Sequence, residues 1–277
     1  MTDRYVLFGN PVEHSPSPRV HAAFAAQTGQ DMTYERLLVP LGEFAVAAGA
    51  FFAEGGCGGN VTLPFKADAH AFASRLTERA RRAGAVNTLV VEADGGVLGD
   101  NTDGIGLVRD LTVNLGWVIA GRRVLVLGAG GATRGALGPL LEQRPALLHI
   151  ANRTAEKAVA LAREFADLGA VTGSGYAELT AEAPFDLLIN ATSASLSGEV
   201  PPLPAGAFGE RAAAYDMMYG AAPTAFLCWA EARGAAALAD GLGMLIEQAA
   251  EAFTLWRGVR PRTAPVIGLI RAELVER

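Results

Sequence analysis

Polar side chains with catalytic potential lie at the ends of apolar runs in the first half of the chain. Lys66 closes the stretch "GNVTLPFK" and opens a helical pattern, although the helix macrodipole disfavours a cation at that end. Asp103, in "GDNTDGIG", follows another strand-like run and could supply a catalytic acid or base. A carboxylate is also favourable at a helix start, so a simple N-cap role for Asp103 stays open.

Hydroxyl and amide side chains occupy similar junctions. Ser15 and Ser17 lie between a strand-like run and a helical pattern, where hydroxyls and backbone donors would suit a carboxylate. Their position alone favours the simpler interpretation, an N-cap in a turn shaped by Pro16 and Pro18. Asn87 starts a strand-like run in "GAVNTLV". Because ligand sites gather at the carboxyl ends of strands in α/β sheets, several such clusters exceed what turns alone require.

A glycine-rich turn occurs in "RRVLVLGAGGATRGAL", residues 122–137. Gly128, Gly130 and Gly131 lie where a strand should end and a helix should begin, so the backbone could approach a pyrophosphate. The third glycine position of the dinucleotide-binding pattern is Thr133 here. An ordinary tight turn is the alternative, but the strand–loop–helix order is the one that the motif requires.

The residues at the end of the next predicted strand indicate which dinucleotide, NAD or NADP, the chain would bind. Asn152, Arg153 and Thr154 stand where an NAD-binding chain usually has an acidic residue for the ribose hydroxyls. Arginine suits the 2′-phosphate of NADP, so the sequence favours NADP over NAD. A helix cap at Asn152 or Thr154, with a solvated Arg153, is the alternative.

Strand-like runs alternate with helical patterns along most of the chain, which predicts an α/β fold with a largely parallel sheet. Asp94-Gly95-Gly96 predicts a hairpin turn, and a domain boundary is expected near Asp103–Ile105. The predicted strands are 5–9, 34–39, 57–61, 88–91, 123–127, 147–151, 187–190 and 213–217. The predicted helices are 17–28, 43–54, 77–83, 106–115, 131–141, 155–165, 224–233 and 242–256.

Composition excludes several classes of protein. The 277 residues carry a formal charge of −6 without an extended basic run, so a nucleic-acid partner is not expected. Cys57 and Cys228 lack metal-type spacing, and the four histidines form no triad or metal pattern, so no metal site is expected. There is no secretory signal and no apolar run long enough to span a bilayer. A cytoplasmic protein is therefore expected.

These segments together resemble the shikimate dehydrogenase family from end to end. The matching pieces are "GNPVEHSPSP", "NVTLPFK", "GAVNTL", "GDNTDGIG", "GAGGATRG", "NRT", "YDMMY" and "ADGLGMLIEQAAEAF". The resemblance implies NADPH-dependent reduction of 3-dehydroshikimate to shikimate, on the route to aromatic amino acids. It also implies two α/β domains with the active site between them: a substrate-binding domain of residues 1–104 and 242–277, and a Rossmann-type NADP-binding domain of residues 105–241.

The resemblance implies a role for each matching position. Lys66 and Asp103 would be the proton-transfer pair and would also contact substrate. The other implied substrate-binding residues are Ser15, Ser17, Thr62, Asn87, Tyr219 and Gln248. The implied cofactor-binding residues are Gly128, Ala129, Gly130, Gly131, Ala132, Asn152, Arg153, Thr154, Met217 and Gly241. A small-molecule substrate and a monomer or homodimer are expected.

Two other functions remain open at this point. A quinate/shikimate dehydrogenase would use a broader range of substrates and cofactors. A non-catalytic NADP-binding regulatory protein could share the fold, but it would have no need to retain Lys66, Asp103, Asn87 and Gln248 together.

Overall fold

The chain folds into two compact units, one built from residues 1–106 and 246–270 and the other from residues 107–245 and 271–277. A computed structural model describes residues 2–180 and 184–276. The first change of unit falls inside helix α5, Asp103–Arg109. The sequence placed the start of this helix at Gly106, which is wrong, because the helix already begins at Asp103 and continues as a π-helical turn over Asp110–Asn114.

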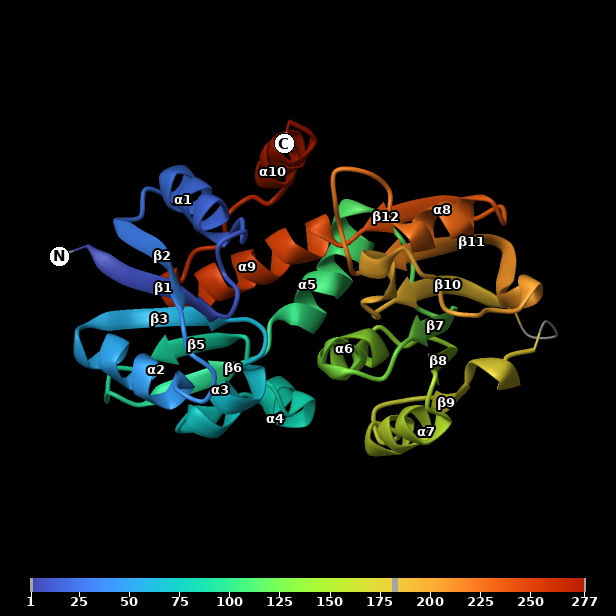
Figure 1. The fold of residues 1–277 in the computed structure, drawn as a ribbon, viewed down its shortest axis with the longest axis horizontal. Helices are drawn as coiled ribbons and strands as arrows, with labels where there is room; N and C mark the ends of the chain where they lie inside the picture. Colours follow the sequence, from blue (N-terminus) through green and yellow to red (C-terminus); the bar gives the residue numbers. More distant parts are fainter. Residues whose placement is uncertain (1, 181–183, 277) are drawn as a thin grey trace. The chain divides into compact units, whose positions relative to one another are not determined.

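The first unit contains a six-stranded mixed sheet in the order β2-β1-β3-β5-β6-β4 (Figure 1). β1 pairs in parallel with β2 and β3, whereas β5 runs antiparallel to both β3 and β6. The predicted turn at Asp94–Gly96 is confirmed as the connection of the β5–β6 hairpin. The strands are β1 Asp3–Gly9, β2 Met32–Leu38, β3 Gly56–Val61, β4 Arg75–Leu76, β5 Thr88–Val91 and β6 Val97–Asp100.

Helices cover both faces of this sheet around β1, an interior strand whose apolar side chains are buried on both faces. Val6 and Phe8 of β1 join a core with α2 and α3, while Tyr5, which directly precedes Val6, packs against the ring of Trp256 of α9. Alternate side chains of a strand point to opposite faces, so α2 and α9 contact opposite faces of β1. The helices are α1 Ser17–Thr28, α2 Phe44–Ala53, α3 Lys66–Phe72 and α4 Glu78–Ala83, with most of α9 Leu242–Arg257 and of α10 Ala264–Val275.

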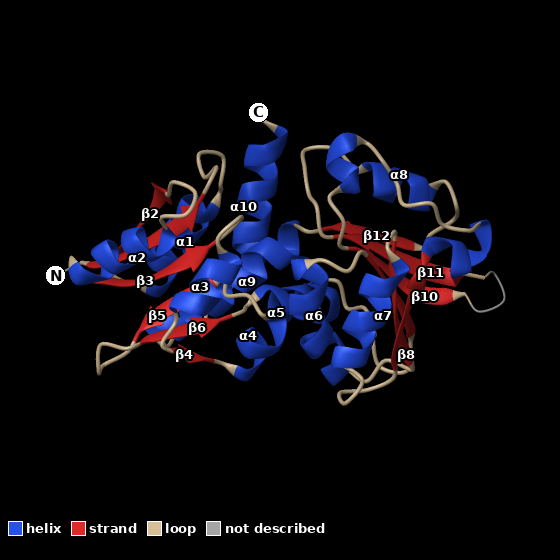
Figure 2. Ribbon diagram, turned by 60° about the horizontal axis from the view of Figure 1, so that its bottom comes forward, coloured by secondary structure: helices blue, strands red, loops and turns tan. Residues whose placement is uncertain are grey.

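The second unit contains six parallel strands in the order β12-β11-β10-β7-β8-β9. In Figure 2 the strands of this unit are red, and its helices α6, α7 and α8 are blue. Neighbouring residues of β7 pack into two separate cores: Val124 and Val126 in one, and Leu125 and Leu127 in the other. Both faces of the sheet are therefore buried, as a parallel sheet requires. The elements are β7 Arg123–Leu127, α6 Gly131–Glu142, β8 Leu147–Asn152, α7 Ala155–Glu164, β9 Val171–Gly175, β10 Phe185–Asn190, β11 Phe208–Asp216, α8 Ala225–Glu231 and β12 Ala237–Asp240.

The register of β3, β5 and β6 brings together the polar residues at the ends of these strands, at one edge of the sheet of the first unit. Asn60, near the end of β3, pairs with Thr88 at the start of β5, and Thr88 pairs with Asp100 at the end of β6. Residues that follow β3 and β6, or precede β5, therefore lie together. Across the described part of the chain, no helix combines the length and the apolar character needed to cross a membrane.

Candidate functional site

Lys66 and Asp103 form an ion pair at this edge of the first unit. Lys66 Nζ donates to Asp103 Oδ2 over 2.6 Å. Lys66 is the first residue of α3 and Asp103 is the first residue of α5, so each side chain is fixed at a helix start. The two side chains are 29% and 14% exposed, which leaves the pair accessible to a small molecule while limiting its contact with water. The pair that the sequence singled out is thus assembled, and both carboxylate oxygens of Asp103 accept hydrogen bonds.

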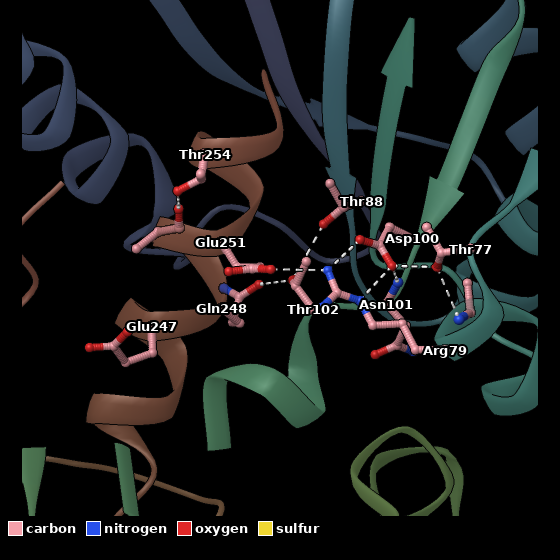
Figure 3. Close-up of polar contacts among 12 residues, drawn as sticks. Thr77, Arg79, Thr88, Asp100, Asn101, Thr102, Glu247, Gln248, Glu251 and Thr254 are labelled. Carbon is pink, nitrogen blue, oxygen red and sulfur yellow. Dashed lines mark hydrogen bonds and ion pairs between the residues drawn. The ribbon is translucent and has the colours of Figure 1, made fainter. Parts of the chain in front are cut away.

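Asn87 links this ion pair to helix α9. Its Nδ2 lies 2.8 Å from Asp103 Oδ1 and 3.3 Å from Gln248 Oε1. Its Oδ1 accepts hydrogen bonds from the Thr102 backbone N–H at 2.9 Å and from Thr88 Oγ1 at 3.0 Å. Gln248 also lies against Thr102, as the close-up in Figure 3 shows. The ammonium group of Lys66, the carboxylate of Asp103 and two amides therefore converge from four segments of the chain.

Ser15 and Ser17 form a hydroxyl pair after β1. Ser15 Oγ donates to Ser17 Oγ over 3.0 Å and accepts from the Ser17 backbone N–H at 3.3 Å. The N-cap interpretation of these serines is wrong, because the N-cap of α1 is Pro16 and the helix begins at Ser17. Arg36 of β2 donates from Nε to the Ser15 carbonyl oxygen over 3.1 Å, which fixes the loop and adds positive charge beside it.

Thr62 lies in the loop that directly follows β3. Its backbone N–H donates to the Phe8 carbonyl oxygen over 2.9 Å, which joins the loops that follow β1 and β3. The cap of α3 is Phe65 and has no side-chain cap hydrogen bond, so a capping role for the Thr62 hydroxyl is not observed. The half-buried Thr62 thus remains available for a ligand.

The glycine-rich turn of the second unit has the geometry of an anion cradle. Gly128 has a φ of +101°, and a Cβ there would lie 3.0 Å from Thr192 Cγ2. Helix α6 follows, and its N-cap, Gly130, has no side-chain cap hydrogen bond. Thr133 replaces the expected third glycine because its hydroxyl donates to the Gly128 carbonyl oxygen over 2.8 Å and thereby holds the turn. The backbone donors at the start of α6 fit a pyrophosphate.

A cavity of about 360 Å³ in the second unit has Arg153 in its wall. Arg153 is exposed, whereas burial raises the pKa of neighbouring Tyr176, with the Arg153 charge opposing the shift. Thr154 is the N-cap of α7, as one alternative held, but its side chain makes no cap hydrogen bond. The exposed guanidinium suits a phosphate, so the residues present fit NADP. The cavity is lined by Asn152, Arg153, Tyr176, Thr192, Ser193, Ala194, Glu199, Val200, Pro201 and Pro202.

Met217 and Gly241 contact one another through their backbones in the second unit. A Cβ on Gly241 would lie 2.1 Å from the Met217 carbonyl oxygen, so only glycine permits this approach. The Gly241 N–H donates to the Met218 carbonyl oxygen over 3.1 Å. Tyr219 follows in the same segment, and burial, together with the Asp240 charge, raises its pKa.

Three supporting residues were not identified from the sequence. Arg36 holds the serine loop, Arg79 binds Asp100 at the end of β6, and Asp216 is fully buried at the end of β11. Asp216 lies within the quoted "YDMMY" segment, so its motif gave a signal, whereas nothing local distinguishes Arg36 or Arg79 from a solvated surface arginine. Among the described residues, no group of three or more His, Cys, Asp or Glu side chains is placed to hold a metal.

Family comparisons match three parts of the chain. Residues 7–89 match the shikimate dehydrogenase substrate binding domain, residues 112–197 match the shikimate/quinate 5-dehydrogenase family, and residues 241–271 match the shikimate 5′-dehydrogenase C-terminal domain. A shikimate dehydrogenase (NADP(+)) from Nitrosospira multiformis is 59% identical over 274 residues, covering 99% of both chains.

Solved structures of similar proteins match most of the chain as well. An Ael1 enzyme from Pseudomonas putida superposes with a TM-score of 0.93 at 49% identity, covering 96% of this chain and 97% of its own. Shikimate 5-dehydrogenase from Thermus thermophilus, solved with NADP(H) and shikimate, has a TM-score of 0.85 at 34% identity, covering 98% of this chain and all of its own. The chain belongs to the shikimate dehydrogenase family.

Proposed function

We propose that this chain is a shikimate dehydrogenase that reversibly reduces 3-dehydroshikimate to shikimate with NADPH. The observation that carries the proposal is the 2.6 Å ion pair of Lys66 and Asp103, set beside Asn87 and Gln248 at one sheet edge. Family membership supports it, since relatives aligned along the whole chain carry this activity in their names.

The ion pair supplies the acid/base chemistry. Reduction of a ketone builds negative charge on the carbonyl oxygen, and a nearby cation that also donates a proton lowers the barrier. NADPH, when bound, supplies the hydride. Lys66 stabilises the developing oxyanion and delivers a proton from Nζ. Asp103 holds the ammonium group in place through the hydrogen bond from Lys66.

The remaining side chains of the first unit orient the substrate. Ser15 and Ser17 bind its carboxylate, aided by the charge of Arg36 beside Ser15. The other substrate-binding residues of this unit are Thr62, Asn87 and Gln248, and Tyr219 of the second unit is a further one. Amide side chains suit this role because each carries both a donor and an acceptor for ring hydroxyls.

The second unit binds NADP. The turn from Gly128 to Ala132, which includes Ala129, Gly130 and Gly131, surrounds the pyrophosphate at the start of α6. Arg153 binds the 2′-phosphate with help from Asn152 and Thr154. Met217 and Gly241 lie by the nicotinamide. The first unit is accordingly the substrate-binding domain and the second the cofactor-binding domain, and the enzyme serves aromatic amino acid biosynthesis in the cytoplasm as a monomer or homodimer.

One assay tests the proposal. NADPH oxidation is followed by absorbance with 3-dehydroshikimate, then with NADH in place of NADPH, and finally in reverse with quinate and NADP⁺. We expect fast turnover only with 3-dehydroshikimate and NADPH. Comparable turnover with quinate or NADH would favour the broader quinate/shikimate enzyme, and no turnover with any pair would leave a non-catalytic NADP-binding protein.

A further inference from the structure

Arg79 and Asp100 form a bidentate ion pair at the end of β6, close in sequence to Asp103. Asp100, the last residue of β6, is fully buried and accepts from Arg79 Nε at 2.8 Å and Arg79 Nη2 at 2.5 Å. Thr77 Oγ1 and the Asn101 backbone N–H also donate to its Oδ1, at 2.5 and 2.7 Å. Asp100 precedes Asp103 by three residues, so anchoring Asp100 also constrains the position of the Asp103 carboxylate.

The same arginine reaches helix α9. Arg79 Nη2 also donates to Glu251 Oε1 over 3.2 Å (Figure 3). Glu251 lies three residues after Gln248, so the two side chains share one face of the helix. One guanidinium thus joins the end of β6 to the face of α9 that carries Gln248.

A second arginine holds Glu251 without touching the strand. Arg260 Nη1 donates to Glu251 Oε2 over 2.7 Å, and its Nη2 donates to Glu247 over 2.6 Å. Arg260 therefore joins two successive turns of α9 through Glu247 and Glu251. Of the two arginines, it is Arg79 that hydrogen-bonds the strand carboxylate.

Asp100 is ionised at neutral pH, so its ion pair with Arg79 persists there. Burial raises the pKa of Asp100, but the hydrogen bonds and charge of Arg79, with the donors of Thr77 and Asn101, outweigh it and leave the pKa below its usual value. Asp100 consequently stays ionised near neutral pH. A lysine could not reproduce the planar fork that binds Asp100 through two nitrogens while extending one of them to Glu251.

We propose that Arg79 is a positioning residue for the reaction: it fixes Gln248 of α9 in register with Asn87 and Asp103 by joining Asp100 to Glu251. This inference rests on the function proposed above. Arg79 acts through Gln248, and the energetic consequence of losing Gln248 depends on whether Arg79 is present.

A double-mutant cycle tests this dependence. Arg79→Gln, Gln248→Ala and the double variant are compared for kcat and for KM with shikimate, together with the Kd for NADP⁺ and the melting temperature. We expect Arg79→Gln to raise the KM for shikimate by about tenfold, and Gln248→Ala to have a several-fold smaller effect in that background than in the unaltered chain. The NADP⁺ Kd should stay within about twofold, and Arg79→Lys should not restore the KM.

Arg75 offers a matched control. It lies on β4 of the same sheet and pairs with Glu92 and Asp94, but it is half exposed. Arg75→Gln should change KM by less than about twofold, as exposed ion pairs contribute little. If Arg79→Gln does not fold, Glu251→Ala severs the α9 end of the link while retaining the Arg79–Asp100 pair, and the same cycle is measured with Gln248→Ala.

Each outcome decides between the two proposals. Strictly additive effects of the Arg79 or Glu251 and Gln248 substitutions in an active enzyme would overturn the positioning role and leave the proposed function intact. A lowered melting temperature with an unchanged KM would also overturn it. Absence of any turnover by the unaltered chain would instead refute the proposed function and the inference with it.

Discussion

The two units hold their ligand-facing groups by different means. In the first, the candidate groups are side chains bound to other side chains: Lys66 to Asp103, Asp103 to Asn87, and Asn87 to Gln248. In the second, the groups that would surround an anion belong to the backbone. Gly128 has a positive φ, and the N-cap of α6 is Gly130, which has no side chain.

This difference follows from the two tasks. Proton transfer and oxyanion stabilisation need particular functional groups held at fixed positions, so each one requires partners. A pyrophosphate is satisfied by backbone N–H groups and a helix dipole, which many sequences provide. Substitutions in the first unit should therefore lower turnover, whereas substitutions in the second should alter cofactor affinity or stability.

The largest expected effect tests the side-chain half of this comparison. Lys66→Ala should lower kcat by about 10²-fold or more, because both the cation and the proton donor are lost. Turnover and NADPH affinity are measured together, and the affinity should be retained. Lys157 is the only other lysine of the sequence and is exposed on α7, so Lys157→Ala is the control and should leave kcat unchanged. Near-normal turnover of the Lys66 variant would disprove the catalytic assignment.

Local patterns identified the long elements well. Helix Ser17–Thr28 has the predicted bounds, and the strand–turn–helix at Arg123–Gly131 was found because strand and glycine signals coincide. Strands β4, β6, β9 and β12 are absent from the predicted strand ranges, although the predicted turn at Asp94–Gly96 implied a strand at β6. β4 has only two residues, and β9 reads "VTGSG", whose glycines and serine lack strand propensity. Pairing with neighbours, which sequence does not reveal, makes these segments strands.

Local sequence patterns singled out part of the candidate site, and family resemblance supplied the rest. Family resemblance named Asn87 and Gln248, 161 positions apart, and the structure places their side chains 3.3 Å apart. Spacing alone could not have joined them, because the contact depends on α9 returning to the first unit. Arg79 and Asp216 were missed for the same reason, since their roles come from long-range partners.

A second prediction concerns a buried carboxylate of the second unit. Asp216 accepts from Asn190 Nδ2 at 3.1 Å, Ser195 Oγ at 2.6 Å, Thr224 Oγ1 at 2.6 Å and the Met218 backbone N–H at 3.0 Å. Asp216→Asn places a donor among these donors and should destabilise the protein by roughly 3 kcal/mol.

Thermal unfolding and kcat measured with saturating NADPH separate stability from chemistry in this variant. The contrast between the units predicts a lower melting temperature with nearly unchanged saturated kcat. A kcat loss as large as that of Lys66→Ala, with unchanged stability, would break the contrast.

A third prediction concerns a buried histidine of the first unit. His21 of α1 is fully buried and stacks on Tyr34 with ring centroids 4.1 Å apart. Burial lowers its pKa to about 3, with the Asn60 side chain opposing the shift. Because an unfolded histidine has a pKa near 6.5, the unfolded chain binds the extra proton between these values, and stability falls as the pH falls.

The expected loss between pH 7 and pH 5 attributable to His21 is roughly 2 kcal/mol. His21→Phe should remove this part of the pH dependence, as measured by urea unfolding at both pH values. Phe24→Leu, in the same aromatic cluster, is the control, since it should lower stability equally at both. An unchanged pH dependence in His21→Phe would show that the buried imidazole is not the source.

The smallest expected effect tests the cofactor half of the comparison. Arg153→Gln should raise the KM for NADPH by about tenfold and leave the KM for NADH nearly unchanged, because a charge-assisted hydrogen bond to the 2′-phosphate is lost. Arg163→Gln, at an exposed position of α7, is the matched control for the loss of one positive charge. The kcat with saturating NADPH should be retained, which contrasts with Lys66→Ala. An equal rise in the KM of both nucleotides would place Arg153 outside the 2′-phosphate site and leave NADP selectivity to backbone and cavity shape.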